Sequence, residues 1–291
     1  MRFTKMHGIG NDYVYVNCFE ESLNGSDVAA LARAVSDRNR GIGSDGLILI
    51  APPEAGAQAD VRMEMYNADG SRSEMCGNGI RCVAKYAIDH GLAGNANGDS
   101  ADIRVQTDRG VLLLQAKMSH GAVDRVRVDM GPPILRPVEI PVDVPGDRCV
   151  RIDVPVADTV LTATCLSVGN PHAVVFLDSL DAVDLGRIGP LMEHHALFPK
   201  RINLHLATVQ SRSEVAMRTW ERGSGITQAC GTGACSVLVA GVLEDRLDRC
   251  VLVHLPGGDL TIEWPKAGDD HGGSVFMTGP ATSVFSGVWP T

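Results

Sequence analysis

Short apolar runs that alternate with polar residues dominate the chain and predict a protein rich in β-strands. In the first half these runs occupy residues 13–18, 46–51, 61–67, 102–107, 111–118 and 123–131. In the second half they recur at 151–156, 162–171, 173–179, 202–210, 214–223, 250–256, 259–264 and 273–281. Several place an apolar side chain at every second position, as half-buried strands do.

Three segments instead have apolar residues at helical spacing. The first is 26–37, where we expect Ser26 to cap the helix. The second follows Cys76 and ends near Gly91, since glycine commonly ends a helix. The third follows Cys230 and is apolar nearly all round, so we expect it inside a core with a curved sheet wrapped around it.

The second and third predicted helices begin within nearly the same sequence, SEMCGNGIRC at 73–82 and TQACGTGACS at 227–236. The halves share more than this pair. Asn67 lies nine residues before Cys76, and Glu221 lies nine before Cys230. Each half also has an earlier Gly-Asn pair, at 10–11 and at 169–170. These matches indicate a duplicated strand-rich unit with one internal helix, and the proline-rich stretch 131–145 is the passage between the halves.

Composition narrows the class of protein. The chain has 291 residues, enough for two domains, with a formal net charge of −9 and no Lys/Arg run, so we do not expect a nucleic-acid binder. No apolar stretch has the length of a membrane helix, and the N-terminus has no signal-peptide pattern. We therefore expect a cytoplasmic protein whose eight cysteines are reduced. Four of them are expected to be small buried hydrophobes: Cys18, Cys149, Cys165 and Cys250.

Cys-Gly-x-Gly at the start of a helix has a specific chemistry. The first turn carries unpaired N–H groups and a partial positive charge, and glycine lets an anion approach them. Such a turn binds a carboxylate and favours thiolate over thiol. One such site suggests a nucleophile, whereas two suggest the inversion of a stereocentre. That reaction needs a base on one face of the carbon and an acid on the other.

Two other readings compete with this one. Cys76, Cys82, Cys230 and Cys235 could form a four-thiolate zinc site, but the spacing between the first two is longer than structural zinc sites use. A thiol redox sensor, in which Cys76 and Cys230 form a disulfide, is the second. We expect no metal.

The motifs KMHGIGNDYV, NADGSRSEMCGNGIRC, SVGNPHAV and ERGSGITQACGTGACS together resemble the diaminopimelate epimerase family. The resemblance implies cofactor-independent epimerisation of LL-2,6-diaminopimelate to the meso form, in lysine and cell-wall biosynthesis. It also implies a homodimer of α/β chains. Each chain would have two similar domains, each a curved, mainly antiparallel sheet around a central helix, with the active site in the interdomain cleft. The domains would be 1–130, completed by about 276–291, and 131–275. A proline or hydroxyproline racemase of the same superfamily is the alternative, against which the MHGIGND and ERGSG elements argue.

The resemblance also implies roles for particular residues. Cys76 resembles the family's proton donor and Cys230 its proton acceptor for the LL substrate, while His172 and Glu221 resemble the side chains that set thiol protonation. The residues implied for substrate binding are Asn11, Asn67, Gly77, Asn78, Asn170, Asn203, Glu221, Arg222, Gly231 and Thr232. One position departs from the pattern, because Gly46 stands where some members have Gln. None of the five lysines lies in a motif that would hold pyridoxal phosphate, so we expect no cofactor.

Overall fold

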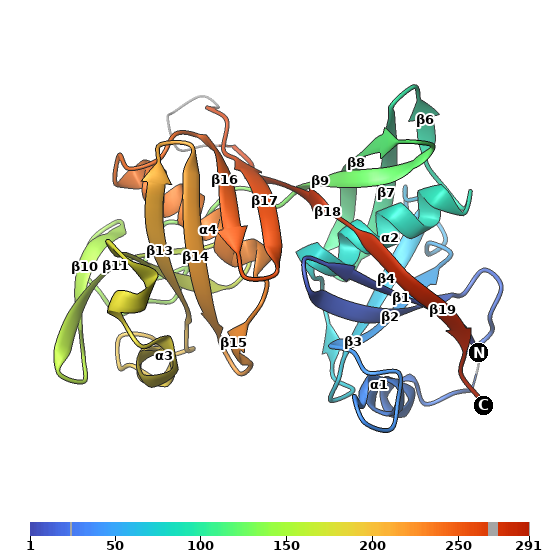
Figure 1. Cartoon of the computed structure of the whole chain (residues 1–291), viewed down its shortest axis with the longest axis horizontal. Helices are drawn as coiled ribbons and strands as arrows, with labels where there is room; N and C mark the ends of the chain where they lie inside the picture. Colours follow the sequence, from blue (N-terminus) through green and yellow to red (C-terminus); the bar gives the residue numbers. More distant parts are fainter. Residues whose placement is uncertain (24, 267–272, 291) are drawn as a thin grey trace. The chain divides into compact units, whose positions relative to one another are not determined.

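The computed structural model describes residues 1–23, 25–266 and 273–290. The chain forms two compact units (Figure 1). The first consists of Met1–Asp129 together with Thr278–Thr291, and the second of Met130–Met277. The chain passes from the second unit back to the first within strand β18 (Phe276–Pro280).

The first unit is a mixed sheet that packs on two helices. Its helices are α1 (Val28–Ser36) and α2 (Gly77–Asp89). Its strands are β1 (Arg2–Gly8), β2 (Asn11–Asn17), β3 (Gly46–Ala51), β4 (Val61–Asn67), β5 (Arg72–Ser73), β6 (Asn95–Asn97), β7 (Ser100–Thr107), β8 (Gly110–Ser119), β9 (Ala122–Asp129) and β19 (Thr282–Val288). Most neighbours pair antiparallel, while β2–β3 and β4–β7 pair parallel. The C-terminal β19 lies beside β1, antiparallel to it (Figure 1).

The second unit repeats this plan. Its helices are α3 (Leu185–Glu193) and α4 (Gly231–Leu243), with a short 3-10 helix at Leu180–Ala182. Its strands are β10 (Cys149–Val156), β11 (Thr159–Ser167), β12 (Pro171–Phe176), β13 (Asn203–Ser211), β14 (Glu214–Glu221), β15 (Gly225–Thr227), β16 (Cys250–Leu255) and β17 (Gly258–Glu263), and the first residues of β18 complete it.

The strand pairing of the two units follows the same sequence of directions. β1–β2 and β11–β12 are antiparallel, and β2–β3 and β12–β13 are parallel. β3–β4 and β13–β14 are again antiparallel, and β4–β7 and β14–β16 again parallel. The helices α2 and α4 have 13 residues each and each follows a short strand. The predicted fold class, a curved and mainly antiparallel sheet around a central helix in each half, is confirmed.

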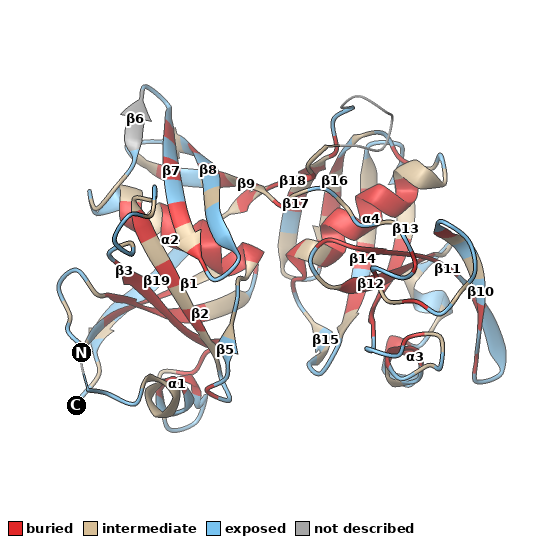
Figure 2. Ribbon diagram, turned by 180° about the vertical axis from the view of Figure 1, so that it is seen from behind, coloured by how far each residue is buried: buried red, intermediate tan, exposed pale blue. Residues whose placement is uncertain are grey.

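The buried position of helix α4 follows directly from its hydrophobic sequence. Ten of its 13 residues are buried, and it contacts β11, β12, β13, β16 and β17. Figure 2 shows the ribbon of α4 almost entirely in the colour of buried residues. A helix without a polar face has no stable place at a surface, so the sheet closes around it. The prediction of a buried third helix is therefore confirmed.

The start of α1 differs from the prediction. The helix begins at Val28, and its N-cap is Asp27 and not Ser26. The Asp27 side chain accepts a hydrogen bond from the backbone N–H of Ala30 at 3.0 Å. The Ser26 prediction is wrong because the chain becomes helical one residue later, which places the aspartate at the capping position.

Helix α3 was not predicted, and its sequence explains why. It contains Gly186, Gly189 and Pro190, which all weaken a helical pattern. Packing requires one of them, since a Cβ at Gly189 would lie 2.3 Å from the ring of Trp220. The strands β1 and β19 at the chain ends were also missed. In β19 the exposed apolar side chains, such as Val284 and Phe285, hide the alternation of a half-buried strand.

The prediction that these cysteines are buried holds for Cys149 and Cys165 and fails for Cys250. Cys149 and Cys165 are buried, and Cys18 is partly buried. Cys250 is exposed, because it starts β16 on the outward side of the alternation that turns Val251 and Val253 inward. All eight cysteines are free thiols in the structure.

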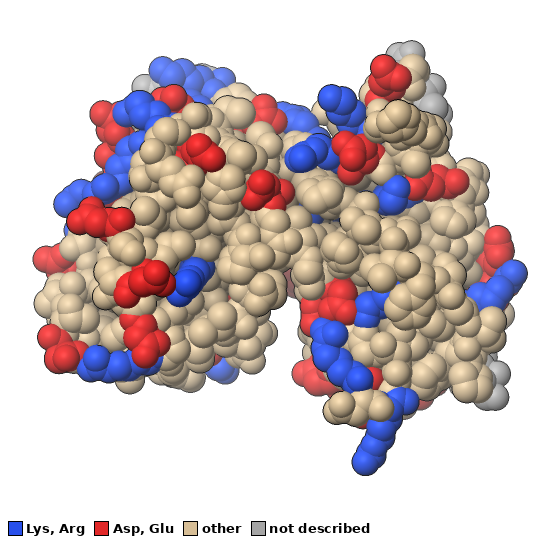
Figure 3. All heavy atoms as spheres, viewed as in Figure 1, with Lys and Arg blue, Asp and Glu red and all other residues tan. Residues whose placement is uncertain are grey.

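The surface carries charges of both signs. Figure 3 shows Lys and Arg side chains interspersed with Asp and Glu on the visible face of each unit. Within residues 1–23, 25–266 and 273–290, no helix has the length and apolar character needed to cross a membrane.

We expect Asp27→Ala to destabilise α1 by about 1 kcal/mol, the usual cost of losing an N-cap acceptor. Ser26→Ala is the matched control and should leave stability within about 0.5 kcal/mol. Hydrogen exchange of the α1 amides measures both effects. Equal loss of protection in the two variants would contradict the assignment of Asp27 as the cap.

Candidate active site

Cys76 and Cys230 occupy the same position in their two units, the N-cap of the central helix. Their backbones are extended, with φ and ψ of −131° and 124° at Cys76 and −129° and 101° at Cys230. The Cys76 carbonyl accepts from Ile80 N at 2.9 Å, and the Cys230 carbonyl accepts from Ala234 N at 2.9 Å. The two motifs that share a sequence therefore also share a local structure.

These two helix starts differ from the other helix starts of the protein. In α1 and α3 the capping aspartates, Asp27 and Asp184, accept from backbone N–H groups of the first turn. At α2 and α4 the capping residue is cysteine, and neither makes a side-chain cap hydrogen bond. The first turns of these two helices therefore lack a carboxylate cap, and their N–H groups, with the partial positive charge of the helix end behind them, suit an anion.

Around Cys76 the structure gathers two asparagines that the sequence assigned to the site. The Cys76 thiol donates to Asn11 Oδ1, with 3.4 Å between sulfur and oxygen. The Asn78 amide donates to the same oxygen, from Nδ2 at 3.3 Å. Asn78 is buried, and its Oδ1 has no hydrogen-bond partner among the described residues. A buried acceptor without a partner is costly, so it is a position at which a ligand donor would be stabilised.

Asn67 and Gly46 face each other at the ends of β4 and β3. Asn67 donates from Nδ2 to the Ser71 hydroxyl at 3.0 Å. A Cβ at Gly46 would lie 2.2 Å from the carbonyl oxygen of Tyr66. The backbone here has no room for a side chain, so the departure from glutamine at this position is enforced by the close approach of the two strands.

Cys230 lies in a more negative and more enclosed setting. Burial raises the pKa of the Cys230 thiol well above its usual value, and the nearby Glu221 carboxylate raises this pKa further. The Gly233 N–H and the Thr232 hydroxyl act in the opposite direction and lower the pKa of Cys230. Glu221 accepts a hydrogen bond from the Thr227 hydroxyl at 2.6 Å, which fixes the carboxylate at the end of β14.

A chain of buried polar side chains runs behind the helix start of α4. His172 Nε2 lies 2.8 Å from Asn170 Oδ1, and His172 Nδ1 lies 2.8 Å from His205 Nε2. His205 Nδ1 lies 3.0 Å from the Thr219 hydroxyl. Burial lowers the pKa of His172 well below its usual value and that of His205 to about 3, so both rings are neutral.

Because both rings are neutral, the hydrogen bonds from Asn170 through the two histidines to Thr219 can run in only one direction. Asn170 Oδ1 can only accept, so His172 carries its proton on Nε2 and accepts at Nδ1. His205 must then donate from Nε2, and its Nδ1 accepts from the Thr219 hydroxyl. The Asn170 oxygen thereby fixes the tautomer of His172 and, through it, that of His205.

Asn203 and Arg222 are linked through the backbone. Asn203 donates to the Pro171 carbonyl at 2.8 Å, and its Oδ1 accepts from the Arg222 N–H at 2.8 Å. Asn203 is buried, so this asparagine ties the segment after β14 to the start of β12. The Arg222 guanidinium donates to the Lys200 carbonyl at 2.9 Å.

Within each unit, therefore, the structure brings the predicted residues into small groups. In the first unit Cys76, Asn11 and Asn78 are in contact, and in the second Cys230 lies with Glu221 and Thr232. The sequence reasoning missed two neighbours that hydrogen-bond to Asn11, Tyr13 and Asp45, and three in the second unit, His205, Thr219 and Thr227. For His205 and Thr219 a signal existed, because they are polar residues at inward positions of otherwise apolar strands. No group of three or more His, Cys, Asp or Glu side chains able to hold a metal ion occurs in the described ranges.

We predict that the alkylation of Cys230 by iodoacetamide is slow at neutral pH and rises only at alkaline pH, since thiolate is the reactive form and burial and Glu221 both disfavour it. Glu221→Gln removes the negative neighbour and should shift this profile to lower pH. Peptide mass spectrometry across a pH series measures both profiles. A wild-type profile that levels off below pH 7 would contradict the assignment.

Gly233 gives a prediction about packing. A Cβ there would lie 2.3 Å from His205 Cε1, whereas a Cβ at Gly79, the corresponding helix position of α2, would meet chiefly the flexible ends of Ile48 and Met63. Gly233→Ala should cost about 1–3 kcal/mol of stability, and Gly79→Ala less. In a His205→Ala background the cost of Gly233→Ala should fall by about 1 kcal/mol or more. Urea unfolding measures this cycle, and strict additivity would contradict the contact.

Comparison with known proteins places these features in a family. The model of the family described as diaminopimelate epimerase matches residues 3–135 and 164–284. A diaminopimelate epimerase from Agathobacter rectalis is 52% identical over 295 aligned positions, which cover 99% of this chain and 98% of the relative. One from Acetivibrio thermocellus is 51% identical, with 99% of this chain and 98% of the relative covered.

Solved structures show how widely the fold is shared. The crystal structure of a probable proline racemase from Agrobacterium radiobacter superposes with a TM-score of 0.69, covering 99% of this chain and 92% of that one, at 12% identity. At this identity the similarity concerns the fold alone. The sequence comparisons are far closer, and on their evidence the chain belongs to the diaminopimelate epimerase family.

Proposed function

We propose that this protein interconverts LL- and meso-2,6-diaminopimelate by a two-base mechanism without a cofactor, with Cys76 and Cys230 as the two acid/base groups. The observation that carries the proposal is the pair of cysteine N-caps. Both thiols stand at the start of a 13-residue helix, in nearly the same backbone conformation and without a side-chain cap. A reaction with two equivalent faces calls for two equivalent groups.

The proton transfers can be followed residue by residue. Glu221 takes the proton of the Cys230 thiol, and the resulting thiolate removes the proton from the α-carbon. The high pKa of Cys230 makes this thiolate a strong base. Cys76 donates its thiol proton to the opposite face of the same carbon and is left as a thiolate. The starting state returns when Glu221 releases its proton to water and Cys76 takes one up from water. In the reverse direction the two cysteines exchange roles.

The helix starts supply the electrostatic part of catalysis. As the α-proton leaves, negative charge develops on the adjoining carboxylate. We assign the N–H groups of Gly77-Asn78 and Gly231-Thr232 to that carboxylate, because first-turn N–H groups stabilise such charge without reorganising. The unpaired Oδ1 of Asn78 supports this assignment, since an ammonium group beside the carboxylate would supply the missing donor.

The remaining polar residues divide between recognition and support. We assign Asn67, Glu221 and Arg222 to the amine and carboxylate groups of the substrate. Asn11, Asn170 and Asn203 are assigned to its distal end. The contacts of Asn170 with His172, and of Asn203 with the backbone of Arg222, support a further positioning role for both. From the family resemblance we also propose a cytoplasmic homodimer.

The decisive experiment is exchange in deuterated water. Reduced protein incubated with LL-diaminopimelate should produce the meso form with deuterium at the inverted α-carbon, detected by NMR and mass spectrometry. Cys76→Ala and Cys230→Ala should each abolish epimerisation, because each face of the carbon loses its only acid/base group. Near-normal turnover in either variant would refute the two-base mechanism.

Two cysteines outside the site serve as matched controls. Cys250→Ser and Cys18→Ser change exposed or partly buried thiols and should retain turnover within about twofold. Proline as substrate separates the proposal from the racemase alternative. Turnover of proline without turnover of diaminopimelate would replace one with the other.

A further inference from the structure

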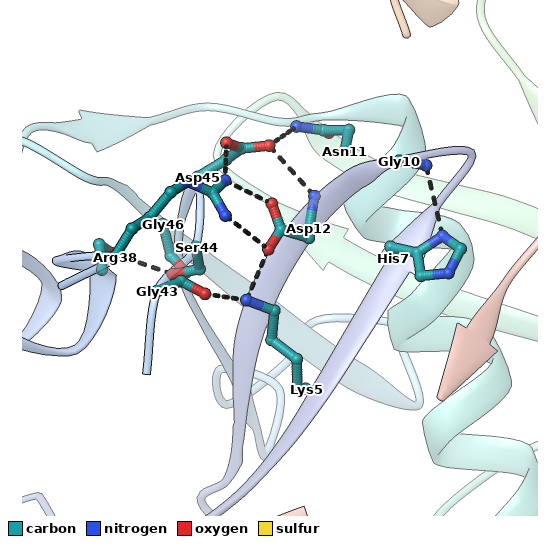
Figure 4. A network of polar contacts seen from close by, with 11 residues as sticks. Lys5, His7, Gly10, Asn11, Asp12, Arg38, Gly43, Ser44, Asp45 and Gly46 are labelled. Atoms are coloured by element: carbon teal, nitrogen blue, oxygen red, sulfur yellow. Dashed lines mark hydrogen bonds and ion pairs between the residues drawn. The ribbon is translucent and has the colours of Figure 1, made fainter. Parts of the chain in front are cut away.

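Asp45 belongs to a network of polar contacts in the first unit and lies one residue before β3 (Figure 4). Its backbone N–H donates to the Asp12 carbonyl at 2.8 Å. Its carboxylate accepts on both oxygens, from Arg38 Nη2 at 2.9 Å on Oδ1 and from the Asp12 N–H at 3.1 Å on Oδ2. Asp12 is in turn paired with Lys5 and Arg38. The position of the Asp45 carboxylate is therefore fixed from several sides.

The carboxylate also accepts a bond from the site residue Asn11. Asn11 Nδ2 lies 2.7 Å from Asp45 Oδ2. Figure 4 marks this hydrogen bond with a dashed line. An ionised carboxylate has only acceptor oxygens, so the asparagine must turn its NH₂ end toward it. The reversed amide would set the Asn11 carbonyl oxygen against a negative oxygen.

The orientation of this amide determines what Cys76 meets. With the NH₂ end on Asp45, the other end places Oδ1 at 3.4 Å from the Cys76 sulfur. An oxygen acceptor stabilises the S–H form and disfavours the thiolate. The Asn78 amide donates to the same oxygen and thus agrees with this orientation.

Three further titratable side chains interact with this sulfur: Tyr13, which hydrogen-bonds to both Asn11 and Cys76, Tyr15 and Cys82. Burial raises the pKa of Tyr13 and of Tyr15 well above their usual values, and it raises the pKa of Cys82 to about 11. These groups change charge only at alkaline pH. Near pH 7, therefore, Asp45 sets the orientation of the Asn11 amide, and this orientation sets the direction of the hydrogen bond from Cys76 to Asn11.

We propose that Asp45 is a positioning residue. Through Asn11 it presents an oxygen to the Cys76 sulfur and holds this thiol in its protonated, proton-donating form. This deepens the proposed function and rests on it for the role of Cys76 as the acid. Asp45 itself acts only through Asn11.

Asp45→Asn tests the proposal because it removes a carboxylate that can only accept. One end of the new amide is an NH₂ group, so this side chain no longer excludes the reversed orientation of Asn11. In the reversed orientation the NH₂ end of Asn11 faces Cys76 and stabilises the thiolate. We expect the alkylation of Cys76 by iodoacetamide at pH 7 to become about tenfold faster, which corresponds to a pKa lower by about one unit. Peptide mass spectrometry reports on Cys76 alone.

A background variant separates this relay from the simple loss of a negative charge. In Asn11→Leu the amide is absent, so Asp45→Asn should no longer change the Cys76 profile. A direct effect of charge would persist there and would weaken with added salt. Arg38→Met is a second control, since Arg38 bonds Asp12 and Asp45 but not Asn11, and it should leave the profile unchanged.

The outcomes are distinct. An unchanged Cys76 profile in folded Asp45→Asn, or an equal change in the Asn11→Leu background, would overturn the proposal. If Asp45→Asn does not fold, NMR of the wild-type chain decides, because the Asn11 amide protons should be shifted downfield and protected from exchange. Unprotected Asn11 protons would again overturn it. None of these measurements uses substrate, so the failure of the wild type to epimerise diaminopimelate would refute the proposed function and leave the Cys76 result standing.

Discussion

The first-turn N–H groups of α2 and α4, which no carbonyl of the same helix can bond, are the constraint on which the rest of the site depends. A helix must leave its first N–H groups without intrahelical partners, and most helices cover them with an aspartate, asparagine, serine or threonine. Here α1 and α3 follow that rule with Asp27 and Asp184. The central helices place cysteine there instead. These two helices lack the stabilisation that a capping aspartate supplies. In exchange, each has a thiol beside a helix end that a carboxylate can approach.

The duplicated units solve the same packing problem with different chemistry. The third residue of α2 and of α4 is glycine, and in both units it packs on the third residue of the strand beneath, Ile48 in β3 and His205 in β13. Ile48 makes an ordinary apolar contact. His205 occupies the corresponding place with hydrogen bonds to His172 and Thr219. The start of α2 therefore packs on an apolar side chain, whereas the start of α4 packs on a histidine ring held by hydrogen bonds.

Fixed hydrogen-bond direction is a common feature of the polar groups in both units. An aspartate that can only accept orients Asn11, and an asparagine oxygen that can only accept orients His172. In each case an oxygen that can only accept determines the orientation of an amide or imidazole side chain whose two ends could otherwise exchange. Buried polar chains of this kind are costly if any member is unsatisfied, so a complete chain holds a single arrangement.

Much of this protein was determined by local sequence. Alternating strands, the all-apolar helix after Cys230 and the repeated Cys-Gly-x-Gly motifs follow from spacing that no distant contact can alter, and the structure confirms the fold class they predict. Other features depend on partners far away in the chain. Helix α3 contains Gly189 because the Trp220 ring lies against it, and residue 46 is glycine because the Tyr66 carbonyl approaches. Asp45 and His205 acquire their significance in the same way, since hydrogen bonds to Asn11 and His172 join residues 34 and 33 positions apart. Periodicity reports which side of an element is buried, but only tertiary packing decides which atoms meet there and in which direction they bond.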